Sequence, residues 1–254
     1  MMALHIVRET ALRTWLKTIR RPVPLTFSFV QPLLWMLIFG FLFHRFTLGA
    51  QYAGLSYLDF ILPGICAMTV LFGASQSGIG IVRDQQIGFL QRMARASTHP
   101  GWLLTGRILA DVVRLLLQAI IVALLGVALG ARLDIDPAGV VIGAAGLVLF
   151  AVAYASLSCW IALKTRAQES MAVFVHLVNM PLLFTSTALV PSRQMPGWLE
   201  SIARWNPLTL VADMLRSALL LDRTPEISTL LPLLLLAVVL FFLGIYEMRH
   251  AADE

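Results

Sequence analysis

Six apolar stretches, each long enough to cross a bilayer as a helix, constrain the fold more than any other feature of this sequence. A helix needs about 20 apolar residues to span the hydrocarbon core. The chain has 254 residues, of which 59% are hydrophobic and 13% charged, whereas soluble domains carry about 25% charged residues. We therefore predict an all-α integral membrane protein whose single domain covers residues 1–254. The six predicted spans are Pro24–Phe43, Leu58–Val82, Ile108–Gly130, Ala138–Leu163, Ser170–Val190 and Leu230–Met248.

The distribution of Arg and Lys predicts the orientation of these spans. If the N-terminus lies inside, the inner segments carry about twice as many of these residues as the outer ones, with Arg216 counted outside. The net charge of +5 is explained by this bias. A nucleic-acid partner is not expected, because no basic run carries interleaved aromatic residues on a soluble surface. Both termini are expected in the cytosol.

Residues 2–21 have the pattern of an amphipathic helix. Apolar residues recur at i, i+3 and i+4, and charged residues including Arg13 and Lys17 fill the other face. Trp15 suits the level of the lipid headgroups, and Pro22 ends the helix. We predict an interface helix on the inner membrane surface. It serves either as an anchor or as a mechanical link to a protein docked below.

A polar stretch, RDQQIGFLQRMARASTHPG, joins the second and third spans on the inner side between Arg83 and Gly101. Wound as a helix over residues 83–100, it would place Leu90 on an apolar face and Arg92 on a charged one. Such a short helix can transmit a push from a soluble partner to two spans. The alternative is a surface helix without a partner.

The outer segment between the fifth and sixth spans, residues 191–229, is predicted to hold two short helices. Pro196 opens the first and Pro207 interrupts the pattern before the second. Trp198 and Trp205 suit the outer interface. The sequence leaves open whether part of this segment re-enters the membrane.

Several kinds of chemistry are absent from the sequence. The two lysines, Lys17 and Lys164, both follow leucine, so no G-K-[ST] phosphate loop exists. The five histidines lack metal-ligand spacing. Cys66 and Cys159 fall in apolar spans and are expected to be core residues. We therefore predict no catalytic, cofactor-binding or metal-binding residues in this chain.

Polar residues within the predicted spans suggest two further classes of function. Ser75 and His176 would suit an intramembrane serine protease, although small residues around Ser75 are more simply a helix-packing face. An ion-coupled secondary transporter is the other alternative, but no chain of buried carboxylates crosses the membrane. Asp111 and Arg114, three residues apart, are expected to pair with each other.

Taken in order, these features resemble the permease subunit of type-2 ABC exporters, especially the daunorubicin-resistance, multidrug-efflux branch. The likeness covers nearly the whole chain. Its most specific parts are QPLLWMLIFG, which starts at Gln31, and the block MPGWL…NPLT…R from Met195 to Arg216, with Pro196, Asn206 and Pro207.

The resemblance implies partners. A second permease, identical or related, and two copies of a separate ABC ATPase that binds ATP and Mg²⁺ would complete a transporter in a prokaryotic plasma (inner) membrane. The loop between spans two and three would be the coupling helix, but Gln85 and Gln86 stand where the family often has acids, and Asp84 is the acid retained. The implied coupling residues are Arg83, Asp84, Gln85, Gln86, Gly88, Phe89, Leu90, Arg92 and Met93.

The substrate pathway is expected between the two permeases, lined by spans two and five. Met and Phe side chains suit a bulky drug-like or lipid-like amphiphile, because they repack around different shapes. The expected pathway residues are Met68, Phe72, Gln76, Asn179, Met180 and Phe184.

Overall fold

The computed structural model describes residues 2–19, 22–45, 48, 52, 54–89, 92, 100–221 and 224–253, and this part of the chain is helical without strands. The helices are α1 (Met2–Ile19), α2 (Pro22–Leu42), α3 (Tyr57–Ser75), α4 (Ser77–Gln86), α6 (Gly101–Ala128), α7 (Pro137–Thr165), α8 (Gln168–Phe184), α9 (Gly197–Ala203), α10 (Pro207–Leu220) and α11 (Leu230–Asp253), with short 3₁₀ turns at Ser192–Gln194 and Ile227–Thr229.

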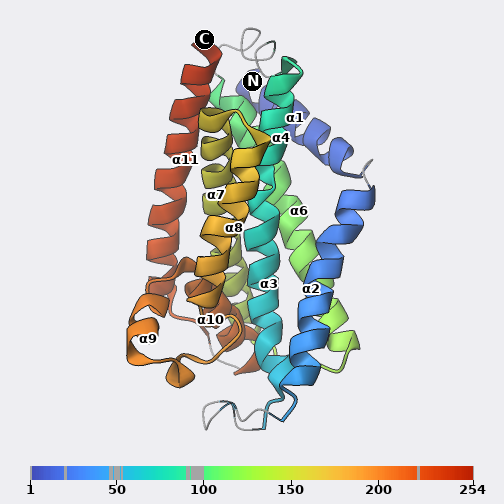
Figure 1. Ribbon diagram of the computed structural model, residues 1–254, viewed down its shortest axis with the longest axis vertical. Helices are drawn as coiled ribbons and strands as arrows, with labels where there is room; N and C mark the ends of the chain where they lie inside the picture. The colour runs from blue at the N-terminus through green and yellow to red at the C-terminus, as the bar shows by residue number, and fades with distance from the viewer. Residues whose placement is uncertain are drawn as a thin grey trace.

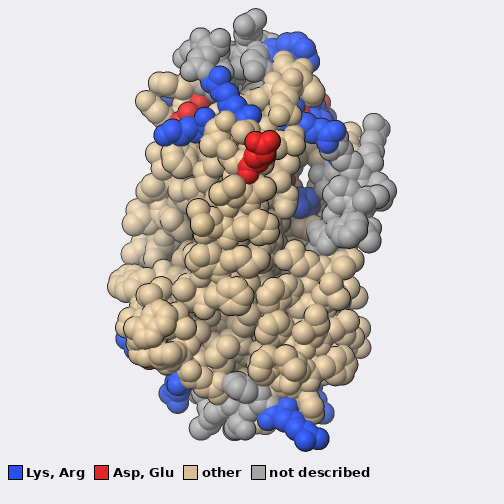
Figure 2. All heavy atoms as spheres, viewed as in Figure 1, with Lys and Arg blue, Asp and Glu red and all other residues tan. Residues whose placement is uncertain are grey.

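Long apolar helices make this a membrane protein. Among the described residues, four stretches are long and apolar enough to cross a bilayer: Tyr57–Gln86, Gly101–Ala128, Pro137–Thr165 and Ile227–His250. A shorter apolar helix covers Phe29–Leu42 within α2. Figure 2 shows Lys, Arg, Asp and Glu mostly toward the two ends of the visible face, with a broad band of other residues between them. The all-α integral membrane class is therefore confirmed.

The long helices run side by side along the molecule (Figure 1). α1 and the C-terminal end of α11 lie at one end, and α9 and α10 lie at the other. α3 is the central helix, since every residue from Asp59 to Leu71 is buried. It packs against α2, α6, α7 and α10.

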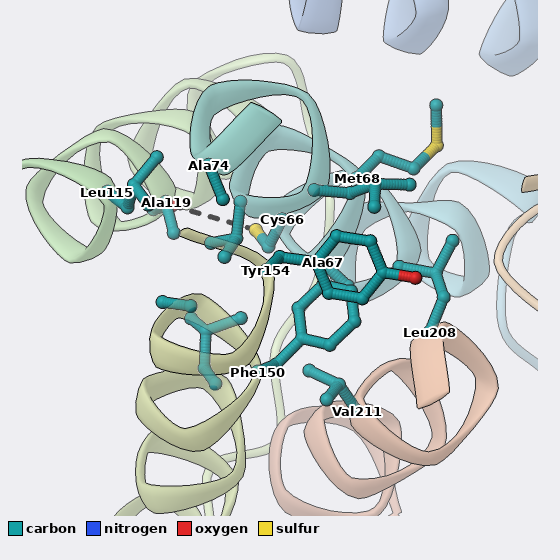
Figure 3. Packing of buried hydrophobic residues seen from close by; sticks show 14 of the residues in the cluster. Cys66, Ala67, Met68, Ala74, Leu115, Ala119, Phe150, Tyr154, Leu208 and Val211 are labelled. Atoms are coloured by element: carbon teal, nitrogen blue, oxygen red, sulfur yellow. Dashed lines mark hydrogen bonds between the residues drawn. The ribbon is translucent and has the colours of Figure 1, made fainter. Parts of the chain in front are cut away.

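The core around α3 is apolar and closely packed (Figure 3). Phe150 and Tyr154 of α7 lie with their ring centroids 4.7 Å apart, and Val211 of α10 is fully buried beside them. Cys66 and Cys159 are buried free thiols, as the sequence predicts for small core residues.

Several helix boundaries differ from the predicted spans. The second predicted span lies within the apolar stretch Tyr57–Gln86, and a turn at Gln76 divides it into α3 and α4. The third helix begins earlier, directly after Pro100. The fifth helix ends at Phe184 instead of Val190. At this end Thr185 N donates to Pro181 O, and the side-chain nitrogen of Asn206 donates to Leu182 O.

The two helices predicted between residues 191 and 229 are both present. α9 begins directly after Pro196, and α10 begins at Pro207 with Asn206 as its cap. Trp198 and Trp205 are exposed, as expected for an interface. α10, by contrast, is largely buried against α7 and α3.

Candidate functional site

A buried carboxylate joins three helices near the end of the bundle that holds α1. Asp84 of α4 lies 2.7 Å from Lys17 Nζ of α1 and 3.0 Å from Arg107 NH1 of α6. Arg13 NH2 of α1 lies 3.5 Å away, while the Asp84 side chain is only 8% exposed. We call these four residues the Asp84 joint. Because both carboxylate oxygens are engaged within the chain, movement of α4 is tied to α1 and α6.

Close helix packing places α1 at this joint. A Cβ at Gly106 would lie 2.5 Å from the backbone oxygen of Val7, so only glycine lets α1 cross α6 this closely. Arg13 and Lys17, one helical turn apart, then face the same carboxylate. The pKa of Arg13 lies below its usual value, mainly because the guanidinium is partly buried. The charge of Asp84 raises this pKa and the charge of Arg107 lowers it. An arginine nevertheless remains charged.

The predicted interface helix is therefore a helix, and two of its three singled-out residues are engaged by Asp84. Trp15, the third, is half-buried. Leu12 and Leu16 on the same helix are 44% and 48% exposed. An exposed apolar strip of this kind fits contact with lipid.

The polar stretch after the second span is not one continuous helix. α4 ends at Gln86, and Gly88 has a positive φ of 65°, a conformation that favours glycine and interrupts a right-handed helix. The guanidinium of Arg92 folds back to donate to Ile87 O at 3.1 Å. Leu90 and Met93 lie outside the described residues.

The remaining predicted coupling residues differ in their exposure and in their contacts. Arg83 and Gln86 are exposed, and Gln86 Oε1 accepts from Gln168 Nε2 at the start of α8 at 3.2 Å. Gln85 is half-buried. The Phe89 ring lies beneath the Arg13 guanidinium, 3.1 Å from its centre. The start of the loop is thus attached to α1, α6 and α8.

The break at Gln76 is stabilised from two sides. The Ser158 hydroxyl of α7 donates to Ser75 O at 2.7 Å and accepts from Gly78 N at 3.0 Å. On the other side, Arg114 of α6 donates to Gly73 O at 3.1 Å. These bonds satisfy backbone groups that a continuous helix would pair internally.

A cavity of about 840 Å³ lies between α1, α2, α3, α4 and α6. Figure 2 shows a hollow on the visible face with blue Lys or Arg atoms inside it. The predicted pathway residues Met68, Phe72 and Gln76 line the cavity together. The other lining residues are Arg13, Thr14, Lys17, Gln31, Pro32, Trp35, Ile65, Thr69, Gly73, Ser77, Ile79, Gly80, Arg83, Asp84, Ile87, Arg107, Asp111, Arg114 and Gln118.

The α6 side of this cavity was missed as a candidate site. Arg107, Asp111, Arg114 and Gln118 recur every three or four residues and form one polar stripe on an otherwise apolar helix. The expected pairing of Asp111 with Arg114 is confirmed at 3.4 Å. The periodicity was the available signal.

The predicted pathway residues of α8 do not line this cavity. Asn179 is fully buried and donates to Ser75 Oγ at 2.8 Å. Met180 is half-buried and Phe184 is 59% exposed. Ser75 is thus bound to Asn179, whereas His176 is exposed, an arrangement that does not make a serine–histidine dyad.

A second charged cluster lies near the opposite end, around Arg216 of α10. Its side chain is 1% exposed, with the guanidinium 3.9 Å from the centre of the Phe60 ring. It donates from Nε to Phe60 O, from NH1 to Thr187 Oγ1 and Asp213 Oδ1, and from NH2 to Thr187 O and Ala188 O. All five N–H donors of an arginine are thereby used. We call Arg216 with these partners the Arg216 anchor.

Metal binding finds no support in the described ranges, where no group of three or more His, Cys, Asp or Glu side chains is placed to hold an ion.

Comparison with known proteins gives a consistent picture. The family described as ABC-2 type transporter matches residues 7–220. The chain is 31% identical over 206 residues to a putative transport permease, ycf38, of Cyanophora paradoxa, covering 80% of this chain and 70% of that protein. It is 31% identical over 204 residues to the daunorubicin resistance ABC transporter permease protein DrrB1 of Streptomyces coeruleorubidus, covering 77% and 68%. It is 25% identical over 190 residues to the probable multidrug ABC transporter permease YbhR of Escherichia coli, covering 72% and 50%.

Proposed function

Because this chain belongs to the ABC-2 type transporter family as a non-catalytic, multi-pass permease subunit, we propose that it forms an ATP-driven exporter of an amphiphile. A second permease copy or paralogue and two ABC ATPase subunits complete the assembly. ATP and Mg²⁺ bind to the ATPase subunits. Two relatives, named as a daunorubicin resistance ABC transporter permease protein and a probable multidrug ABC transporter permease, support a drug-like or lipid-like substrate.

The proposed topology has six spans with both termini in the cytoplasm of a prokaryotic plasma membrane. α2, α3 with α4, α6, α7, α8 and α11 cross the bilayer. α8 has 17 residues, about 26 Å at 1.5 Å per residue, so it needs the following turn to reach the surface. The location of α1 and the end of α11 at one end of the bundle supports this arrangement (Figure 1).

The Asp84 joint is the observation that carries the proposed mechanism. The loop that begins at the end of α4 is the proposed docking point of the ATPase. α4 continues from α3, the central helix, and Asp84 ties it to α1 and α6. A push on the loop therefore reaches three helices at once, because a buried, multiply bonded carboxylate moves with its partners.

The proposed substrate pathway lies between two permeases. The exposed Phe184 and half-buried Met180 on α8 support a surface that a second copy covers. Closure of the ATPase dimer would move α4 and bend the chain at Gln76, where the helix is already interrupted. Phe72 and Met68, one and two turns from this break, would shift with it.

Co-purification with the ATPase tests the docking. The double substitution Arg92→Glu and Met93→Asp in the loop is expected to abolish ATPase association and efflux. The matched control, Arg204→Glu and Trp205→Asp, reverses or adds charge at exposed positions at the opposite end and is expected to leave association intact. If association and efflux both survive the loop substitutions, the coupling assignment is wrong. Efflux that persists without any ATPase and follows an ion gradient would instead identify a secondary transporter.

A further inference from the structure

The cavity beside α3 carries a surplus of positive charge that ATP coupling alone does not require. Five basic side chains line it against two acidic ones. The basic residues are Arg13, Lys17, Arg83, Arg107 and Arg114, and the acidic residues are Asp84 and Asp111.

The surplus is concentrated at one end of the cavity. Arg114 and Asp111 neutralise each other at 3.4 Å. Asp84, by contrast, is shared by Arg13, Lys17 and Arg107. One carboxylate balances one of these three cations, so the joint retains a net charge of about +2 from the stoichiometry of its groups. An anion placed there would be attracted by charges already held in position.

The cavity also has apolar walls, alongside the uncharged polar residues Gln31, Thr69 and Gln118. Ile65 and Met68 of α3 and Trp35 of α2 line it, with the Trp35 ring stacked on Phe39 at a centroid distance of 5.0 Å. Along α3 and α4 the lining changes from these apolar residues to the charged Asp84. A volume of about 840 Å³ suits a small-molecule ligand, since such pockets measure about 300–1,000 Å³.

Buried polar atoms along the cavity lack partners within the described structure. These are Ser77 Oγ, Arg107 Nε and Asp111 Oδ2, and all three residues line the cavity. Ser77 is 3% exposed. A buried polar group without a partner is costly. The polar side of the cavity is thus not fully satisfied by the protein's own groups.

We propose that this cavity binds an anionic amphiphile. Its phosphate or carboxylate head lies between Lys17 and Arg107, and its apolar chain runs along Trp35, Ile65 and Met68. A cationic amphiphile would meet charge of its own sign at the same place and is excluded. The proposal concerns binding and does not depend on the ATP-driven transport proposed above.

Three probes share a dodecyl chain and differ in the charge of the head group: dodecyl phosphate, dodecylphosphocholine and dodecyltrimethylammonium. They test which head-group charge the cavity prefers. Binding is measured on the full-length permease alone in an uncharged maltoside detergent. The signal is the Trp35 fluorescence, taken as the difference from Trp35→Phe. Dodecyl phosphate is expected to bind about tenfold more tightly than the zwitterionic probe, because it bonds to charged donors. Equal affinities for the three probes would overturn the proposal.

Two substitutions on one helix provide the matched pair. Lys17→Gln removes a cavity cation and is expected to weaken dodecyl phosphate binding about tenfold. Arg8→Gln removes the same charge from a 73% exposed side chain of α1 that is not among the lining residues, and should leave affinity unchanged. If the two substitutions weakened binding equally, dodecyl phosphate would be attracted by the positive charge of the whole surface and not by the cavity.

Nanodiscs distinguish the two sources of such a ligand. If anionic phosphatidylglycerol in the disc prevents dodecyl phosphate binding and phosphatidylcholine does not, the occupant is a membrane lipid. If both discs permit binding, the occupant is an anionic amphiphile that enters from the cytosol. Both results support the site. Since no ATPase is present, failure of binding leaves the coupling proposal untouched, and failure of coupling leaves the binding result untouched.

Discussion

The Asp84 joint and the Arg216 anchor differ in how completely their charged groups are paired. At the anchor, one arginine uses all five donors on carbonyl, hydroxyl and carboxylate oxygens, and it is 1% exposed. At the joint, three cations share one carboxylate beside a cavity. A fully satisfied buried group has one stable arrangement, whereas a cluster with more cations than carboxylates beside a cavity can accept a further anion. We therefore expect the anchor to stabilise the fold, and we propose that movement is transmitted through the joint.

The largest expected effect comes from Arg216→Leu. It leaves the buried carbonyls of Phe60, Thr187 and Ala188 without their donor and should cost about 3–5 kcal/mol, since each unsatisfied buried group costs about 1–3 kcal/mol. The midpoint of thermal unfolding in detergent should fall by roughly 10 °C. Arg204→Leu, whose exposed side chain pairs with Glu200, is the control. A midpoint for Arg216→Leu equal to that of the control would show that the anchor does not stabilise the fold.

The next effect separates geometry from charge. Arg216→Lys keeps the charge but loses the planar fork that binds three backbone carbonyls, so we expect a loss of about 2 kcal/mol. Arg13→Lys at the joint should cost less than about 1 kcal/mol, because its contact with Asp84 is long and shared. Urea titrations of both variants measure this difference. Equal losses would remove the distinction between the two clusters.

Asp84→Asn tests whether the joint holds α1 in place. Without the carboxylate, Arg13, Lys17 and Arg107 repel one another, and we expect a stability loss of about 1–2 kcal/mol. α1 should detach first, so trypsin should cleave after Arg13 and Lys17 faster than in the parent chain. Asp134→Asn, which neutralises an exposed acid outside the joint, is the control. Unchanged cleavage would mean that packing at Gly106 alone holds α1.

The smallest effect is expected from Lys17→Gln. Its side chain is 42% exposed, so the ion pair should contribute less than about 1 kcal/mol and should weaken as salt rises. The stability difference from the parent chain, measured at low and high ionic strength, should therefore shrink with salt. A difference that is insensitive to salt would place the bond in a more enclosed environment than its exposure indicates.

Much of the helical framework could be predicted because it depends on local sequence. The apolar runs gave the membrane class, and Pro196 and Pro207 gave the starts of α9 and α10. The amphipathic spacing of the N-terminal segment gave α1. Each of these signals acts within a few turns of the chain, where hydrophobicity and backbone restriction decide the outcome.

The sites depended on tertiary contacts that a single sequence does not display. Arg216 counts as an outer charge in the sequence, yet it is buried because carbonyls from a segment 28 or 29 residues distant surround it. The break at Gln76 depends on Ser158, a residue 83 positions away from Ser75. A single sequence also does not show which face of α8 points into the bundle. Asn179 was therefore predicted to line the pathway, whereas in the structure it donates to Ser75 inside the bundle.

The central claim is that movement enters through the Asp84 joint and reaches the break at Gln76, and one labelling experiment tests it. Gln76→Cys, in a chain with Cys66→Ala and Cys159→Ala, places a single thiol at an exposed position that lines the cavity. Its rate of maleimide modification is measured in the permease–ATPase complex before and after trapping with ATP and vanadate. We predict that trapping changes the rate when Asp84 is present and does not change it when Asp84→Asn is added. An equal change in both complexes would contradict the claim.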